Sequence, residues 1–353
     1  MRKVLIFCAL ALLCALPALG AGVSVPGLDQ IWAEADSCGV NREASLDEGL
    51  SGLFAAALDQ IGGLFQASLA TAMKLVAVVL LCALAESARA GEETALQGVT
   101  LAGVLAITAL TLTDMDTMIG LGRDTLGRME SFSALLLPAM AVLTAATGGV
   151  TAAAARQGAT VLFSQLLIAV MDRLLVPLVY AFVAASCAYA AVGNPGMKKV
   201  AELLKSAVTF LLTALLLAFV GYLTASGAIA GSVDAAAVKA AKLAISRAIP
   251  VVGGILADAS ESVLAGAGAL RGAVGLAGML VVLALCLTPF LRLAMQYLVY
   301  KGAAALCATV AQPKLSGLID AIGSAFGLVL GMTGAGALVL LVSIVSAVSA
   351  VTP

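Results

Sequence analysis

The sequence contains no histidine, and this absence excludes several classes of enzyme. Histidine is the commonest general base at neutral pH and the usual nitrogen ligand of catalytic zinc. A Ser-His-Asp hydrolase and a membrane metalloprotease are therefore excluded, whereas an enzyme that uses a Ser-Lys pair or two carboxylates is not. The seven cysteines have neither the spacing of a disulfide framework nor that of a metal site. We expect no metal and no cofactor.

Charged residues are also scarce, at 11% of the 353 residues, whereas a soluble domain carries about 25%. Hydrophobic residues make up 62% of the chain. A fold of this length cannot shield so much apolar surface from water, so lipid must be the solvent for most of it. The composition predicts an all-α, polytopic integral membrane protein, because helices satisfy their own backbone hydrogen bonds in a bilayer.

The N-terminus has the pattern of a secretory signal peptide over residues 1–20. Arg2 and Lys3 form the positive region, residues 4–16 are apolar, and the small residues Ala18 and Gly20 suit cleavage after Gly20. An uncleaved signal anchor is the alternative. In either case the segment that follows is expected outside the cytoplasm.

Residues 21–60 form an acidic segment. Arg42 is its sole basic residue, and from Leu46 onward its apolar positions have the spacing of an amphipathic helix. An acidic exported segment agrees with the rule that lysine and arginine stay in the cytoplasm. We therefore expect an extracytoplasmic segment at 21–60 and a polytopic transmembrane domain at 61–353. The acidic residues of the segment are Asp29, Glu34, Asp36, Glu43, Asp47, Glu48 and Asp59.

The transmembrane domain contains nine apolar windows close to the length of about 20 residues that a spanning helix needs. Asp172-Arg173 alone separates the fourth window from the fifth, and Arg292 alone separates the seventh from the eighth. Each of these pairs is two spans in a tight hairpin, one kinked helix, or a partly re-entrant segment. The sequence thus predicts seven to nine transmembrane helices, with the lysine-rich loop 193–205 in the cytoplasm. The windows are 67–86, 95–113, 131–150, 155–171, 174–192, 206–229, 273–291, 293–311 and 322–350.

Residues 114–130, between two of these windows, have the pattern of an amphipathic helix. We interpret the segment as an interfacial helix that lies flat on the outer leaflet, with a partner-binding helix as the alternative. Lys74, Arg156 and Lys301 lie near the ends of apolar windows, where a long side chain can reach the headgroups. The apolar face of 114–130 consists of Met115, Met118, Ile119, Gly122, Leu126 and Met129.

The pattern of residues 232–272 predicts a hairpin of two helices with a break at proline and glycine between them. The helical part of this segment is expected at about 234–272. Pro250 cannot continue the first helix, and Gly253 and Gly254 permit a sharp turn. Irregular backbone at membrane depth requires surrounding protein or water, which favours a re-entrant or vestibule-lining hairpin. An extracytoplasmic hairpin with solvated charges is the alternative. One face of the second helix carries the candidate pore-lining or docking residues Asp258, Glu261, Ser262 and Ala265.

The run AIPVVGGILADASESVLAG, residues 248–266, resembles the central signature of the stage III sporulation protein AE family. The layout of signal peptide, exported segment and many spans is also similar to that family, as is the region from Tyr300 to Pro313. The positions that match the signature are Pro250, Gly253, Gly254, Asp258 and Glu261.

The resemblance implies a membrane protein of the mother cell that faces the forespore. Its partners would be the other membrane proteins of the stage III complex, which joins the two cells through a channel and is needed for late forespore development. The resemblance implies no active site. The alternative is an autonomous secondary transporter or permease for a small solute, coupled through Asp258 or Glu261.

Enzymatic, nucleotide and nucleic-acid functions have little support in the residues. Asp258 and Glu261 have no general base, metal ligand or nucleophile beside them, so we do not expect an enzyme. The glycines at 266–272 lack the spacing of a dinucleotide fingerprint, and no lysine follows a glycine loop as in a P-loop. We expect neither a nucleotide nor a nucleic acid as a partner.

Overall fold

The computed structural model describes residues 28–37, 46–88, 93–146, 162–225, 273–310 and 312–349. All regular structure in these ranges is helical, which confirms the predicted all-α fold class. The signal peptide at 1–20 and the hairpin at 232–272 lie outside the described residues. The same holds for the hairpin's candidate residues Pro250, Gly253, Gly254, Asp258, Glu261, Ser262 and Ala265.

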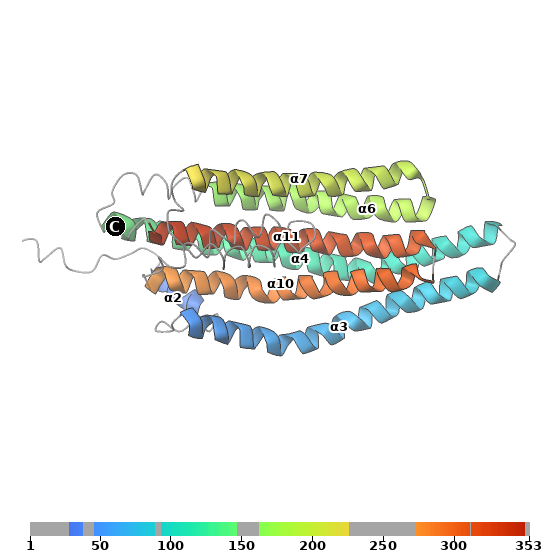
Figure 1. Cartoon of the computed structure of the whole chain (residues 1–353), viewed down its shortest axis with the longest axis horizontal. Helices are drawn as coiled ribbons and strands as arrows, with labels where there is room; N and C mark the ends of the chain where they lie inside the picture. The colour runs from blue at the N-terminus through green and yellow to red at the C-terminus, as the bar shows by residue number, and fades with distance from the viewer. Residues whose placement is uncertain are drawn as a thin grey trace, which may run out of the picture.

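The described helices form an elongated bundle (Figure 1). A short helix, α2 (Leu28–Ser37), packs near one end, and the long helices lie side by side along the long axis. These are α3 (Leu46–Ala88), α4 (Glu93–Ala146), α7 (Pro195–Ala225), α10 (Ala273–Ala308), α11 (Pro313–Ser349) and a continuous helix Leu162–Val192. This last helix contains a π-helical turn, η2 (Met171–Leu175), followed by α6 (Val176–Val192).

Successive long helices run in opposite directions. The end of α3 and the start of α4, the turn at 193–194, and the turn between α10 and α11 all lie at one end of the bundle, on the right in Figure 1. We call it the connection end. Helix α2 and the start of α3 lie at the opposite end.

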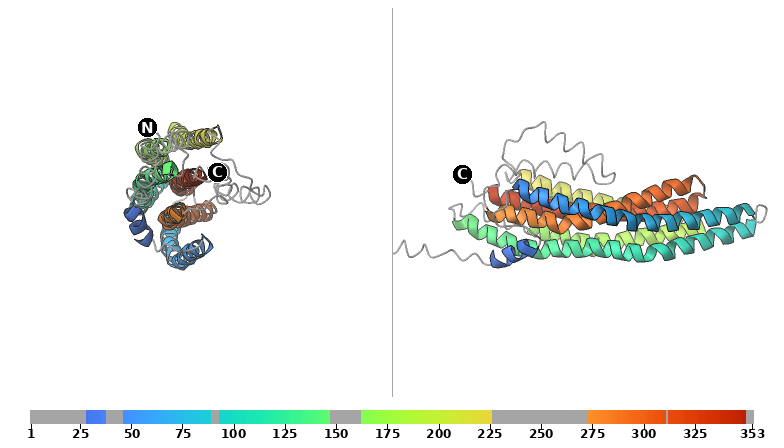
Figure 2. Two further views of the ribbon diagram at one scale, coloured as in Figure 1. Left: turned by 90° about the vertical axis from the view of Figure 1, so that its left-hand side faces the viewer. Right: turned by 90° about the horizontal axis from the view of Figure 1, so that it is seen from below.

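Helix α11 is the centre of the bundle. It contacts α4, α6, α7 and α10, and Figure 2 shows it between these helices when the bundle is seen end-on. In the most apolar stretch of α11, 94% of the residues are buried, compared with 11% in that of α3. A helix that is apolar on all sides is stable only when protein or lipid surrounds it. Here protein supplies most of that environment.

The described residues contain six helices long and apolar enough to cross a membrane, and this corrects the boundaries of the predicted spans. In the described residues, the windows 95–113 and 131–150 both fall in α4, which ends at Ala146. The windows 155–171 and 174–192 both contribute to the helix Leu162–Val192, and 273–291 and 293–311 both fall in α10, which ends at Ala308. Asp172-Arg173 and Arg292 therefore do not end helices. Of the readings left open for these pairs, the structure has one continuous helix in each case, with Pro289 inside α10.

The expected separate helix at 114–130 is the second correction. These residues lie in the middle of α4, which has 54 residues and is about 80 Å long, well beyond the thickness of a bilayer core. The predicted apolar face is real, but it packs on α11 instead of lying on lipid. Gly122 faces Val329, and Leu126 contacts Gly336.

Helix α6 ends in a tight turn that requires glycine. Gly193 has a φ of 75°, and its backbone N–H donates to the Tyr189 carbonyl at 2.7 Å. The Asn194 side chain then accepts a hydrogen bond from the Gly196 N–H at 2.8 Å, which starts α7. Glycine adopts positive φ without the steric cost that a Cβ adds.

Replacement of Gly193 by alanine is expected to destabilise the protein by about 1 to 2 kcal/mol, because a Cβ is unfavourable in left-handed backbone. Thermal unfolding of the purified protein in detergent measures the change. Gly302→Ala is the matched control, since a Cβ at Gly302 meets nothing within 4 Å in the middle of a helix. Equal stability of the two variants would contradict the role assigned to Gly193.

Candidate functional site

Polar side chains from four helices form two adjacent groups that are partly buried where the helices pack together. We call the two groups together the polar layer, and it consists of Asp114 on α4, Lys205 on α7, Gln296, Tyr300 and Lys301 on α10, and Asp320 and Ser324 on α11. Ionisable residues within apolar helices are costly and mark functional sites by default. The polar layer is therefore the first candidate site.

The first half of the polar layer is centred on Asp114. Its Oδ2 accepts hydrogen bonds from the Tyr300 hydroxyl at 2.9 Å and from the Gln296 amide at 3.1 Å. Both donors are neutral, and no cation of the described residues lies within ion-pair distance of this carboxylate. Tyr300 is fully buried, and its ring packs edge-on against Phe326 with the ring centres 5.0 Å apart. This half links α4 to α10.

The second half of the polar layer is centred on Ser324, which is 2% exposed. The Lys301 ammonium donates to the Ser324 hydroxyl at 2.9 Å and to Asp320 Oδ1 at 2.6 Å. The Lys205 ammonium donates to the same hydroxyl at 3.3 Å. This half links α7, α10 and α11, and it holds two cations against one carboxylate.

Two glycines of α11 let α10 approach closely enough for these contacts. A Cβ at Gly323 would lie 3.1 Å from the Cβ of Tyr300, and a Cβ at Gly327 would lie 2.9 Å from the Tyr297 ring. Small residues four positions apart allow close helix packing in membranes. The glycine spacing of α11 therefore positions the tyrosines of α10.

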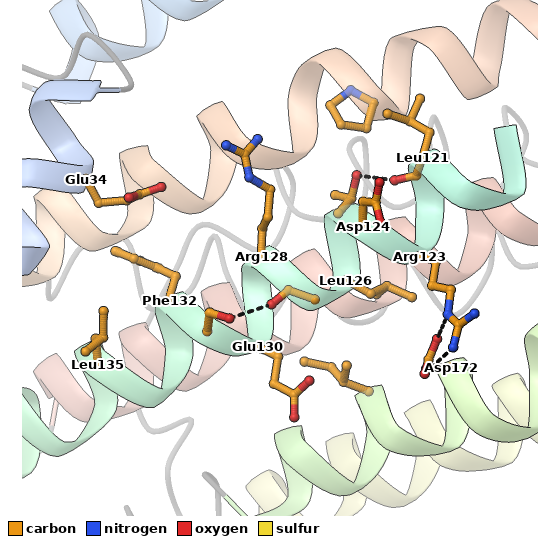
Figure 3. Close-up of a pocket in the computed structure, with 15 residues that line it drawn as sticks. Glu34, Leu121, Arg123, Asp124, Leu126, Arg128, Glu130, Phe132, Leu135 and Asp172 are labelled. Atoms are coloured by element: carbon orange, nitrogen blue, oxygen red, sulfur yellow. Dashed lines mark hydrogen bonds and ion pairs between the residues drawn. The ribbon is translucent and has the colours of Figure 1, made fainter. Parts of the chain in front are cut away.

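A charged cavity of about 820 Å³ lies along α4, beside α2 and η2. Figure 3 shows Arg128 extending toward α10 and Glu34, whereas Glu130 extends from the other side of α4. Arg123 forms a two-pronged ion pair with Asp172, in which one contact measures 3.2 Å. The charged residues that line this cavity are Glu34, Arg123, Asp124, Arg128, Glu130 and Asp172.

A family model described as stage III sporulation protein AE matches residues 41–351. The chain belongs to this family. The match contains the signature at 248–266 from which the resemblance was inferred, so that inference is confirmed. Membership implies a role in sporulation.

A curated member of the family agrees with this assignment. The chain is 23% identical over 202 residues to the stage III sporulation protein AE of Bacillus subtilis (strain 168), and the alignment covers 57% of this chain and 51% of that protein. The chain thus spans about half the length of the relative it matches. No solved structure matches the chain.

For this member of the AE family, the polar layer was largely missed by the sequence analysis. The expectation that Lys301 reaches the headgroups stays a prediction, and the structure adds that its ammonium group pairs with Asp320 across the α10–α11 turn. Asp114 was assigned to the segment 114–130, and Lys205 to a cytoplasmic loop. The sequence does contain a signal for the Lys301–Asp320 pair. The two residues lie at nearly equal distances from the connection between α10 and α11, and residues at such positions face each other in an antiparallel helical hairpin.

The described residues contain no group of three or more histidine, cysteine, aspartate or glutamate side chains that could hold a metal ion. The acids of the polar layer are instead held by hydroxyl, amide and ammonium donors. The arrangement can hold helices together and stabilise buried charge, and it places the Ser324 hydroxyl within hydrogen-bond distance of two lysine ammonium groups.

Proposed function

We propose that this protein is a non-enzymatic membrane subunit of the sporulation channel complex that links mother cell and forespore, and that it is needed for late forespore development. The observation that carries the proposal is the family match over residues 41–351. Its partners would be other membrane proteins of the stage III complex.

The packing of the bundle supports a subunit more than a complete conduit. The central helix α11 is closely packed through Gly323 and Gly327, and the charged groups Lys301, Asp320, Arg123 and Asp172 are paired with one another. Pairing lowers the energetic cost of burying these charges. These pairs do not form the line of titratable acids across the bundle that a proton or ion pathway would need. A path for cargo would then require other subunits.

The exposed surface of α4 supports contact with another protein. Near the connection end it exposes Leu101, Leu105, Leu110 and Leu112, as a lipid-facing helix does. From residue 116 to residue 131 its exposed positions other than Gly127 are polar, namely Asp116, Thr117, Arg123, Asp124, Arg128, Glu130 and Ser131. Lipid would be a poor environment for these side chains, so we place water or a partner subunit there.

Charge placement suggests an orientation in the mother-cell membrane. Lys198, Lys199 and Lys314 lie near the connection end, whereas α2 at the opposite end carries Asp29, Glu34 and Asp36. The positive-inside rule then puts the connection end in the cytoplasm and the N-terminal segment outside, after cleavage of the signal.

The alternative of an autonomous transporter has one observation in its favour. Asp114 lies among apolar helices, and no cation of the described ranges is within ion-pair distance of it, as expected of a coupling carboxylate. Purified protein in liposomes would then transport a solute without partners, and Asp114→Asn would abolish the flux. Flux that appears only when other complex subunits are present would favour the subunit proposal.

Deletion of the gene in its native host tests the proposal directly. We expect growth to be normal, heat-resistant spores to be lost, and a late forespore reporter to stay silent, with all three restored by the wild-type gene. Heat-resistant spores at the wild-type level in the deletion strain would refute the proposed function.

A further inference from the structure

Lys205 stands in an unusual position for a lysine. It is half-buried in the fourth turn of α7, and its ammonium group contacts α11 through Ser324. Among the described residues, no carboxylate lies within ion-pair distance of it. Asp320 pairs with Lys301, and Glu202, one turn away on α7, pairs with Lys198 at 3.9 Å. A half-buried cation without a counterion is unfavourable unless an anion approaches it.

Two ammonium groups therefore share one hydroxyl oxygen, and only that of Lys301 also contacts a carboxylate. Ser324 accepts from both Lys205 and Lys301, so the two cations are held close together in an environment of reduced dielectric constant. Asp320 offsets one of the two charges. The remaining positive charge attracts an anion that offers several acceptor oxygens.

The group is open to the surface. The Lys301 side chain is 30% exposed and that of Asp320 is 50% exposed, whereas Ser324 beneath them is buried. An anion from outside the bundle can thus reach the lysines without unfolding any helix. Further from the connection end, α7 and α10 expose large apolar side chains, including Phe210 and Leu298. A ligand with both an anionic group and hydrocarbon chains fits this surface.

The backbone of Lys205 lies near the boundary between the headgroup region and the hydrocarbon core of a bilayer, from which its long side chain can reach a lipid phosphate. It lies six residues beyond the exposed Lys199, which is about 9 Å along the helix. The polar region on each side of the hydrocarbon core is about 5 to 8 Å thick. Lys198, Lys199 and Lys314 add positive charge at the same end of the bundle, and basic side chains near a membrane surface attract anionic lipids.

We propose that Lys205, Lys301 and Ser324 form a binding site for the phosphate of an anionic phospholipid, at the surface where α7 and α10 pack on either side of α11 (Figure 1). The lysines would contact the phosphate oxygens, and the acyl chains would lie along the exposed apolar side chains of the two outer helices. This site goes beyond the proposed role in the sporulation complex and does not depend on it.

Lipid retention by the purified full-length protein tests the site. The protein is reconstituted into vesicles of phosphatidylcholine alone or of phosphatidylcholine with phosphatidylglycerol, extracted in mild detergent, and weighed with its bound lipid by native mass spectrometry. We expect the wild type to retain phosphatidylglycerol in preference to phosphatidylcholine. Lys205→Gln should reduce that retention about fivefold, the effect of one basic residue near a membrane surface.

Two further variants separate a specific site from general attraction. Lys199→Gln removes the same charge from an exposed position on the same helix and should reduce retention much less than Lys205→Gln does, because Lys199 contributes only general attraction. Asp320→Asn removes the competing carboxylate and should increase retention, so the proposal stays testable even if Lys205→Gln fails to fold. Equal retention of the two lipids, an equal loss in Lys199→Gln, or no increase in Asp320→Asn would overturn the proposal.

Inorganic phosphate distinguishes a lipid from a free anion. If added phosphate stabilises the protein from phosphatidylcholine vesicles against heat as strongly as phosphatidylglycerol does, and Lys205→Gln abolishes both effects, the occupant is free phosphate and the lipid assignment is wrong. Stabilisation by phosphatidylglycerol alone supports the lipid.

Discussion

Replacement of Tyr300 by alanine is expected to lower the free energy of unfolding by about 3 to 5 kcal/mol, the usual cost of truncating a buried aromatic residue. Tyr300 is fully buried, its ring packs on Phe326, and its Cβ lies against Gly323. The truncation would leave a cavity between α10 and α11 and would remove one of the two donors to Asp114. Denaturant-induced unfolding in detergent measures the loss.

The milder change Tyr300→Phe isolates the hydroxyl group. It keeps the ring packing and leaves a partly buried carboxylate one donor short, at a cost of about 1 to 3 kcal/mol. Tyr180→Phe is the matched control, because the Tyr180 hydroxyl also contacts an aspartate, Asp116, but at 3.5 Å and on the exposed surface. A Tyr300→Phe protein as stable as the Tyr180→Phe control would show that the bond to Asp114 contributes nothing.

The apolar face of 114–130 shows how much local pattern reveals. Its period of 3.6 residues predicted both a helix and the correct buried positions, since Met115, Ile119, Leu126 and Met129 are buried in the structure. The pattern does not tell lipid from protein as the apolar neighbour. The segment was therefore placed on the membrane surface, whereas α11 covers this face.

The merged spans have a related physical cause. In a hydropathy window, each charged residue lowers the score and so divides an apolar stretch in two. The helix itself can continue through a charged residue whose side chain forms an ion pair. Asp172 is paired with Arg123 from α4, a contact between residues 49 positions apart that no local window contains. Pro289 and Arg292 likewise lie inside the single helix α10.

The polar layer depends on tertiary contacts in the same way. Asp114, Lys205 and Tyr300 come from three helices, and their sequence separations exceed any local period. Only the Lys301–Asp320 pair, on consecutive helices, was within reach of a topological argument. The family signature at 248–266 is contiguous in the sequence. The family could therefore be recognised from the sequence more readily than the site could.

Replacement of Gly122 by alanine is expected to destabilise the bundle by about 2 to 3 kcal/mol, a large effect for one methyl group. A Cβ at Gly122 would lie 2.3 Å from the Val329 Cγ1 atom at the contact between α4 and α11. A β-branched side chain in a helix is held in one rotamer, so Val329 cannot turn aside. The helices must separate, and Asp114 on α4 would move relative to its hydrogen-bond donors on α10.

Gly120→Ala is the control for this change, because a Cβ two residues earlier on the same helix meets nothing within 4 Å. It should leave stability unchanged or slightly raised, since alanine favours helix over glycine. In the native host, Gly122→Ala should reduce the number of heat-resistant spores, whereas Gly120→Ala should sporulate as the wild type does.

A second substitution tests whether the clash itself is the cause. Val329→Ala removes Cγ1, and the nearest atoms to the new Cβ are then Thr333 Oγ1 at 3.5 Å and the residue 329 Cβ at 3.9 Å, both ordinary contacts. Val329→Ala alone should destabilise the protein, because it opens a cavity beside a buried position. The double variant should nevertheless be more stable than the sum of the single changes predicts, by about 1 kcal/mol or more. Additive effects would mean that Gly122 matters for its backbone and not for the close approach of α4 to α11.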